Sequence, residues 1–582
     1  MTTTLRRLVT ALTLLAAFAP APAFAAGPTK EQNEATQRLQ QDRQALRKAD
    51  ARLQEARAAL LDVPTSRASV SLSLAKMAFD TANLSIVMNA KPEDVLSWLR
   101  KGERYVMEAS MSLIPSRGAE VRAMLIDAGS LPKTEVELIK LLDKLAAAHF
   151  NVLVPEVYRR GYTIYPSAFT DRDPDFKDAP DILKILVREA HVRGMEVQPW
   201  VWTFRARSPG FGNPLLGRLP GLGASTDGKE TRFLSAANPL AREYVFGLLD
   251  ELAEHYDIDG LLLDYIRYDE EIPEDDTSKT RFALEYRARH GVMPTFPVPP
   301  HSQLAVEWQL WREQQVNTAV QELSRMLRAK HPRFPIGAAI FRGEGYARLA
   351  KMQHWRHWSN NQWVDWAAPM LYTPKNEDLV KWLDWETDHH TRTNLIYPIL
   401  GVHRMDERSD LVDEIVELHA KNVPGFMIFA LAHFDMTLLD DLKAGPFREA
   451  AAVPHRNLIR ATRRVLVQAN HYLTRVFTEG DFEAAATARM LHKELVAISV
   501  QLPLHELPYW QNQPLIERIQ GVQALADAAP WPDAVRKEFK HRLDYAITLV
   551  QANAFQLDHT RFVPSSLPPI QIQDAPKNGQ GD

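Results

Sequence analysis

The segment from Asp259 to Asp269, with the sequence DGLLLDYIRYD, joins a short apolar run to charged and aromatic side chains. Such a run, bounded by Asp-Gly, predicts a buried parallel strand. The strand would end at Asp264, with Arg267 three residues later. A charged group at the end of a buried strand is costly unless it is paired or used in a reaction. Asp264 is therefore the first candidate for a catalytic carboxylate, and an ion pair with Arg267 or Arg205 is the structural alternative.

Short apolar runs recur through the middle of the chain and alternate with helical patterns, which predicts βαβ units and a parallel sheet. The predicted strands cover residues 121–126, 151–157, 195–202, 260–264, 336–341, 363–371, 395–400 and 425–431. Eight units in roughly 330 residues favour an α/β fold, a (β/α)8 TIM barrel flanked by N- and C-terminal all-α extensions. A doubly wound open sheet is the structural alternative, although no Gly-rich phosphate fingerprint follows the first strand.

In a TIM barrel the carboxyl ends of the strands line one mouth, where catalytic residues are placed. Two further carboxylates are candidates there: Glu156, at the end of the second strand, and Glu344, in an Arg-Gly-Glu-Gly turn after the fifth. A salt bridge to Arg159 or Arg160 is the structural alternative for Glu156, and a solvated loop is the alternative for Glu344. Paired carboxylates of this kind are typical of glycosidic bond cleavage.

Aromatic, basic and amide side chains near the same strand ends are candidates for substrate binding, because aromatic faces stack on sugar rings and polar groups bind hydroxyls. These candidates are Trp200, Trp202, Arg205, Asn238, Arg267, Tyr268, Tyr372 and His433.

Other reaction chemistries have no signature in the sequence. The chain contains no cysteine, which excludes disulfides, thiol nucleophiles and thiolate metal sites. His354 and His357 lack a matching motif such as H-E-x-x-H, and no G-x-S-x-G elbow is present. We therefore expect no metal and no cofactor, and we disfavour acyl transfer and metal-dependent deacetylation of a polysaccharide.

The first 25 residues have the pattern of a cleavable signal peptide. Arg6 and Arg7 precede the apolar run Leu8–Ala19, and Ala23-Phe24-Ala25 forms an A-x-A cleavage site. The pattern predicts a periplasmic or secreted protein with no membrane anchor after cleavage. The net charge of −4, which becomes −6 without the leader, argues against nucleic acid as a partner.

Helical patterns occupy both sides of the predicted barrel. We expect an N-terminal helical region over residues 26–115, the barrel over 119–447, a C-terminal helical region over 452–560 and a disordered tail over 564–582. In the first region Leu39, Leu46, Leu53 and Leu60 recur every seven residues, which predicts one long helix packed on a partner. These helical ends are candidate surfaces for an envelope protein partner.

Several ordered motifs resemble those of the glycosyl-hydrolase-like 10 family of bacterial exported proteins. They are Glu120–Gly129; Phe150-Asn151-Val152 with Pro155-Glu156-Val157 and Tyr165-Pro166-Ser167; Val197–Arg205; Asn238-Pro239 with Arg242; Tyr256 and Asp259–Tyr268; and Val364-Asp365-Trp366 to Tyr372. The resemblance covers roughly residues 119–447 and leaves both helical ends unexplained.

This resemblance implies a TIM barrel that hydrolyses a polysaccharide of the cell envelope, because the family includes a divisome-associated hydrolase of peptidoglycan glycan strands. Two positions depart from the family pattern. Asp269 replaces a proline that many members carry, and Tyr265 replaces a second aspartate beside Asp264. The expected function is exported glycoside hydrolysis in which Asp264 works with Glu344 or Glu156. The alternative is a non-catalytic glycan-binding protein with partner-binding helical ends.

Overall fold

A computed structural model describes residues 30–207, 229, 231–269, 271–373, 375–388, 395–405, 408–480, 482–504 and 507–557. The predicted signal peptide and C-terminal tail lie outside the described residues. The chain divides into two compact units, the first containing residues 30–51 and 69–106 and the second containing residues 52–68 and everything from 107 onward. Within the described residues, every helix is too short or too polar to cross a bilayer.

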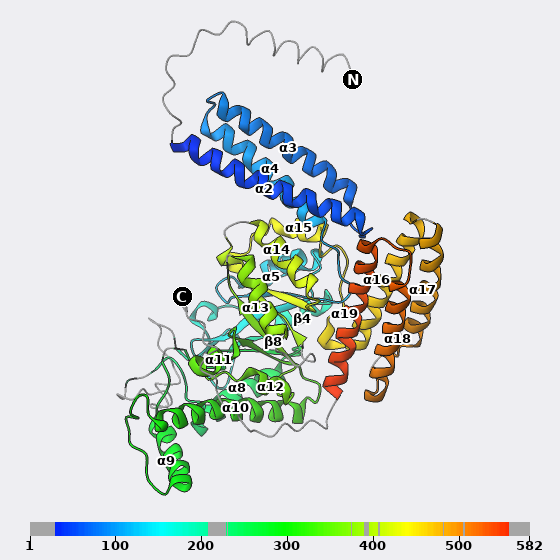
Figure 1. Cartoon of the computed structure of the whole chain (residues 1–582). Helices are drawn as coiled ribbons and strands as arrows, with labels where there is room; N and C mark the ends of the chain where they lie inside the picture. Colours follow the sequence, from blue (N-terminus) through cyan, green and yellow to red (C-terminus); the bar gives the residue numbers. More distant parts are fainter. Residues whose placement is uncertain are drawn as a thin grey trace, which may run out of the picture. The chain divides into compact units, whose positions relative to one another are not determined.

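The first unit is built from three helices that lie side by side (Figure 1). They are parts of α2 (Lys30–Ala58), α3 (Thr65–Val87) and α4 (Pro92–Ser112). Ion pairs join α2 to both neighbours, through Arg38–Glu103 at 2.6 Å and Arg43–Asp80 at 3.1 Å. Phe79 of α3 is buried against Gly102 of α4, where a side chain would clash with its ring.

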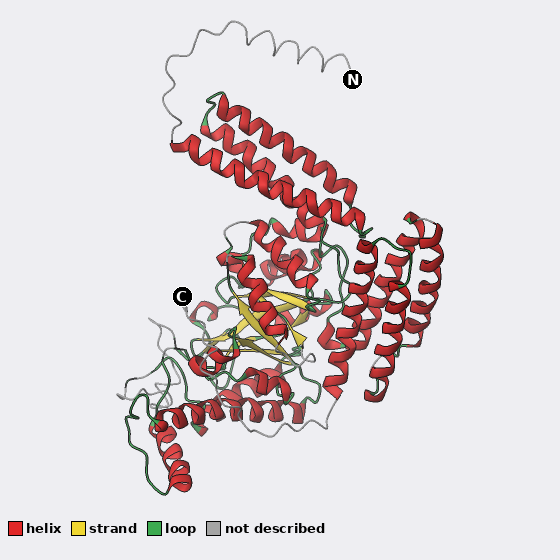
Figure 2. Ribbon diagram, in the orientation of Figure 1, coloured by secondary structure: helices red, strands yellow, loops and turns green. Residues whose placement is uncertain are grey.

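The second unit contains a closed barrel of parallel strands (Figure 2). In chain order the strands are β1 (Val121–Ile126), β2 (Val152–Arg159), β4 (Glu196–Val197) with β5 (Trp200–Trp202), β6 (Leu261–Asp264), β7 (Ile336–Ile340), β8 (Trp366–Leu371), β9 (Leu395–Ile396) with β10 (Ile399–Gly401), and β11 (Gly425–Phe429). Each pairs with its sequence neighbours, and β1 pairs with both β2 and β11, which closes the ring. The TIM-barrel prediction is therefore confirmed, and the open sheet is excluded.

Helices connect the strands and surround the barrel (Figures 1 and 2). Those described are α5 (Glu135–Ala147), α6 (Ile182–Val192), α8 (Pro239–His255), α9 (Asp276–His290), α10 (Gln303–Lys330), α11 (Glu344–Lys351), α12 (Trp355–Asn360), α13 (Asn376–Asp388), α14 (Arg408–Ala420) and α15 (Leu438–Ala444). The short hairpin strand β3 (Tyr162–Thr163) extends β2 in the antiparallel sense. The longest insertion follows β6, where both α9 and α10 precede β7.

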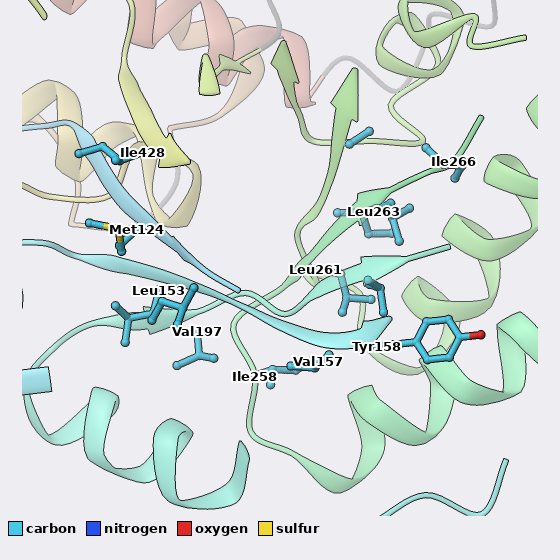
Figure 3. Close-up of a cluster of buried hydrophobic side chains, with 14 of the residues drawn as sticks. Met124, Leu153, Val157, Tyr158, Val197, Ile258, Leu261, Leu263, Ile266 and Ile428 are labelled. Carbon is cyan, nitrogen blue, oxygen red and sulfur yellow. The ribbon is translucent and has the colours of Figure 1, made fainter. Parts of the chain in front are cut away.

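Alternate residues of each strand face two different cores. Outward residues such as Leu153, Leu261 and Leu263 pack in the layer that also contains helix residues (Figure 3). Inward residues such as Leu262 and Trp366 fill the barrel itself. Gly337 makes room for the Trp366 indole, since a Cβ there would lie 2.1 Å from the ring.

Four C-terminal helices cover the amino-terminal end of the barrel: α16 (Leu458–Glu479), α17 (Phe482–Gln501), α18 (Tyr509–Asp527) and α19 (Asp533–Leu557). Their buried side chains belong to the same apolar cluster as the barrel interior. The Tyr545 hydroxyl donates to the Ala119 carbonyl at 2.7 Å, directly before β1. His455, just ahead of α16, contacts Glu196 of β4 at 2.9 Å.

Candidate active site

Glu156 and Asp264 point into the barrel near the carboxyl ends of β2 and β6. Val154 and Leu262 belong to the interior cluster, and side chains two residues further along a strand point to the same side. Both carboxylates are buried. Two of the three predicted catalytic residues therefore share one interior surface.

The strand register places these two carboxylates at one height. β5 lies between β2 and β6, and pairs Trp200 with Glu156 and Trp202 with Asp264. Neighbouring strands of a TIM barrel are staggered by about one residue each, so a two-residue offset over two strands brings the residues level. Their Cα atoms are then roughly 10 Å apart, since strands are about 4.8 Å apart. The same stagger adds Met370 of β8 and Phe429 of β11 to this layer of four.

Asp264 accepts three hydrogen bonds. Trp200 Nε1 donates to one carboxylate oxygen at 3.0 Å. The other oxygen accepts from the Tyr265 backbone N–H at 2.7 Å and from Arg267 at 2.5 Å. Tyr265 adopts a left-handed φ of 48°, which turns the chain immediately after the carboxylate. The indole, backbone and guanidinium donors together fix the orientation of Asp264.

Arg267 also interacts with a second acid, Asp269. Its Nε lies 3.7 Å from Asp269, and Asp269 accepts from Lys351 of α11 at 3.1 Å. Burial alone would raise the pKa of Asp269, but Arg267 and Lys351 hold it below its usual value. Asp269 therefore supplies an acid that anchors Arg267, the arginine that binds Asp264.

Glu156 has weaker partners than Asp264. One oxygen accepts the Ala128 backbone N–H at 3.0 Å, and Arg159 approaches only to 3.6 Å because it also binds Asp173. Burial raises the pKa of Glu156 to about 7, against the lowering effects of the Ala128 N–H and Arg159, and the nearby Asp127 raises it further. Glu156 therefore exchanges its proton near neutral pH, which suits a general acid.

One wall of the mouth is a cluster of rings. Tyr372 stacks on Phe429 with centroids 5.2 Å apart, and His403 packs edge-on against Tyr372 at 5.2 Å. His433 lies beside His403 at 5.4 Å and is exposed. Gly401 is required beneath this wall, since a Cβ there would lie 2.8 Å from Tyr372.

The other wall contains Trp202, Tyr265 and Arg205. The Trp202 and Tyr265 rings are 4.9 Å apart, and the Arg205 guanidinium lies over both at 5.0 and 4.6 Å. Within the described structure, the buried Trp202 Nε1 and Arg205 Nε have no hydrogen-bond partner. Donors of this kind are costly to leave unpaired, and both atoms are covered by surrounding protein atoms in the described structure.

Three predicted residues are engaged elsewhere. Glu344 begins α11 and pairs with Arg356 at 2.8 Å and His354 at 3.5 Å. Burial alone would raise its pKa, but His354 and Arg356 lower it. Asn238 caps α8 through the Leu240 N–H, and the buried Tyr268 hydroxyl accepts the Ala236 N–H. The structure does not bring Asn238 or Tyr268 into the mouth.

Two mouth residues, Phe429 and Gly401, were absent from the sequence-based candidates. Phe429 lies at the end of the Gly-Phe-Met-Ile-Phe strand, and strict alternation along that strand would have placed it on the inner face with Met427. In the part of the chain that is described, no three His, Asp or Glu side chains converge as a metal site requires.

The comparison with protein families gives one match. Residues 121–399 match the family described as Glycosyl hydrolase-like 10. The matched segment runs from β1 into β10 and contains Glu156, Asp264 and Tyr372. The resemblance inferred from the ordered motifs is thereby confirmed, and the barrel has a glycosidase-like fold.

Solved structures with a similar fold have low sequence identity to this chain. The PgaB (BpsB) glycoside hydrolase domain from Bordetella bronchiseptica is 15% identical, with 56% of this chain and 99% of that chain covered and a TM-score of 0.41. The catalytic domain of β-amylase from Paenibacillus polymyxa is 10% identical, with 57% and 96% covered and a TM-score of 0.40. No curated protein matches the chain.

Proposed function

We propose that the barrel is a glycoside hydrolase in which Glu156 is the general acid and Asp264 is the carboxylate that stabilises or attacks the anomeric carbon. The observation that carries this proposal is the pair itself. Two inward carboxylates lie in one layer, and their surroundings differ in the sense that acid/base catalysis needs. Glu156 has a pKa raised to about 7, while Asp264 is bound by three donors including a guanidinium.

Glu344 is the weaker candidate for the acid. Its pKa is lowered by its hydrogen bond with His354 and by Arg356, against the effect of burial, so it is ionised at neutral pH. In the proposed reaction Glu156 gives its proton to the leaving glycosidic oxygen. Asp264, oriented by Trp200 and Arg267, meets the positive charge that develops at the anomeric carbon.

The two walls of the mouth suit a sugar chain. Tyr372 and Trp202 offer ring faces on which sugar rings can stack, and the exposed His433 lies on the same side as Tyr372. The signal-like N-terminus and the family resemblance favour a cell-envelope polysaccharide as substrate, with peptidoglycan glycan strands as the first to test. In this proposal the mature protein acts outside the cytoplasm.

A substrate panel tests the proposal. Purified mature protein is incubated with peptidoglycan glycan strands, with and without stem peptides, and with other envelope polysaccharides, and the release of reducing ends is measured. Asp264→Asn is expected to abolish release while glycan binding persists. Ser167→Ala, in the loop after β3, is the matched control and should leave release unchanged. Binding without release by the wild type across the whole panel would favour the non-catalytic glycan-binding alternative.

A further inference from the structure

Helix α3 exposes a stripe of large apolar side chains, although it also buries another face in the three-helix unit. The exposed fractions along the stripe are Val70 60%, Leu74 37%, Met77 66%, Leu84 52% and Met88 70%. The buried face of the same helix contains Leu72, Phe79 and Ala82. A surface helix of a soluble protein normally carries polar residues opposite its buried face. The exposed apolar stripe on α3 therefore indicates a surface that binds a partner.

The spacing of the exposed stripe is that of a coiled-coil seam. Residues 70, 74, 77, 81, 84 and 88 alternate steps of four and three, which is the heptad pattern of a and d positions. From Val70 to Leu84 the seam extends over 14 residue steps, or about 21 Å of helix, and Met88 follows directly after the last residue of α3. Thr81 is the only polar residue in it.

The hydroxyl groups along this face are already satisfied within the helix. Thr81 Oγ1 donates to the Met77 carbonyl at 2.8 Å. Ser73 and Ser85, which flank the seam, donate to the Ser69 and Thr81 carbonyls at 2.8 and 2.9 Å. Covering this face would therefore bury apolar surface without leaving a hydroxyl unpaired, and the small serines allow a second helix to approach closely.

The seam is complementary to itself when two copies run antiparallel. The antiparallel register pairs Val70 with Met88 of the second copy, Leu74 with Leu84, and Met77 with Thr81, so every position meets an a or d position and none is left over. Because the pairing is reciprocal, it forms six layers about a two-fold axis.

We propose that α3 is a self-association surface through which two copies of this chain form an antiparallel coiled-coil dimer. The composition of the helix favours a second copy over a membrane surface. The exposed stripe has no aromatic residue and Arg67, Lys76 and Asp80 are the only charged residues of α3, whereas helices that lie on membranes carry many Lys and Arg residues beside aromatic ones. The proposal does not depend on the barrel being an enzyme.

Sedimentation equilibrium of the mature protein over a wide concentration range tests the association. We expect dimer that dissociates on dilution, and the double variant Leu74→Glu/Leu84→Glu should weaken the dimer at least tenfold, because it places like charges opposite each other in two layers. Val192→Glu is the matched control, since Val192 is 76% exposed on α6 outside the seam. Circular dichroism and thermal unfolding confirm that the variants are folded. A wild type that stays monomeric throughout, or a double variant that associates like the wild type, would overturn the proposal.

Disulfide trapping tests the register, and the cysteine-free chain makes it unambiguous. Leu74→Cys and Leu84→Cys are prepared separately and oxidised alone or as a mixture. The antiparallel register predicts a covalent dimer in the mixture and little in either single preparation, since residue 74 faces residue 84 of the other copy. Efficient cross-linking of each variant with itself would instead show a parallel pair and contradict the register. Absence of cross-linking in all three samples would contradict α3 pairing.

Discussion

Carboxylates are buried at both ends of the barrel, but their ionic and hydrogen-bonding partners differ. At the amino-terminal end, Glu120 contacts Arg122 at 2.9 Å and His419 at 2.7 Å, and the Glu120 and Arg122 side chains are fully buried. At the carboxyl-terminal end, Glu156 is nearly as buried, but Arg159, its nearest cationic partner among the described residues, lies at 3.6 Å. Burial raises the pKa of both glutamates, yet His419 and Arg122 bring the pKa of Glu120 down to about 2 while that of Glu156 remains about 7.

Burial alone therefore does not identify the reactive carboxylate. Glu196 repeats the pattern of Glu120, because His455 and Arg456 overcome the burial that would raise its pKa. At the amino-terminal end, Glu120 joins the start of β1 to α14, and Glu196 joins β4 to the segment just ahead of α16. An acid with few partners at the mouth instead keeps an exchangeable proton. Substitutions at the two ends should therefore separate stability from activity.

Asp264→Asn should have the largest effect on activity. Asparagine preserves the shape of the side chain but removes the charge that meets the anomeric centre, so we expect a loss of about 10³-fold or more in kcat/KM, a size typical of removing a catalytic group. Arg267 keeps Asp269 as a partner, so the thermal midpoint should change little. Initial rates on the best substrate of the panel, together with thermal unfolding, check both parts. A large drop in stability with unchanged kcat/KM would assign Asp264 to the structural class of Glu120.

Glu120→Gln should have the opposite effect, a loss of stability with little change in activity. Removing the anion leaves the Arg122 guanidinium buried without its counter-charge, which costs about 3–5 kcal/mol in other proteins. Because the folded pKa of Glu120 is below its unfolded value, its contribution is present above about pH 4.5 and is lost as the pH falls toward 2. Denaturant unfolding at pH 7 measures the loss, and kcat/KM per folded molecule should match the wild type.

Much of the fold could be predicted from the sequence, and the reason is local. Each of the eight apolar runs is a short period-two or fully buried segment bounded by turn residues, so each strand was identifiable by itself. The strand-end position of Asp264 could be read from one eleven-residue segment. The layer that joins it to Glu156 depends on strand pairing around the ring, and no single segment contains that register.

The partners of the candidate acids were harder to predict for the same reason. Trp200 donates to Asp264 across 64 residues of sequence, and Arg356 and His354 neutralise Glu344 from an adjoining helix and its preceding turn. Strand-end position alone ranked Glu344 beside Glu156. The contrast in pKa that separates them arises from tertiary contacts, which the sequence does not display.

Glu156→Gln should produce an intermediate effect that depends on pH and on the leaving group. The wild-type rate is expected to fall as the pH rises through about 7, because the Glu156 proton is lost. Glutamine cannot protonate the leaving oxygen, so we expect a loss of about 10²-fold and no alkaline limb assigned to this residue. On an aryl glycoside with an acidic phenol the loss should nearly vanish, since that leaving group needs no proton. Equal losses on both substrates, or an unchanged pH profile, would remove Glu156 from the role of acid.

Glu414→Gln should have the smallest effect and separates a raised pKa from catalysis. Glu414 is buried on α14, and burial together with Asp410 and Asp413 raises its pKa to about 9. The folded pKa lies above the unfolded value, so stability is fully present below about pH 4.5 and declines as the pH rises toward 9. The decline is at most about 1.4 kcal/mol per pH unit, and glutamine should flatten it. The free energy of unfolding should therefore fall less between pH 6 and pH 8 in the variant than in the wild type, and the two decreases should differ by about 2 kcal/mol. The kcat/KM of the variant should be unchanged. A variant that instead lost activity like Glu156→Gln would show that a raised pKa outside the mouth also serves the reaction.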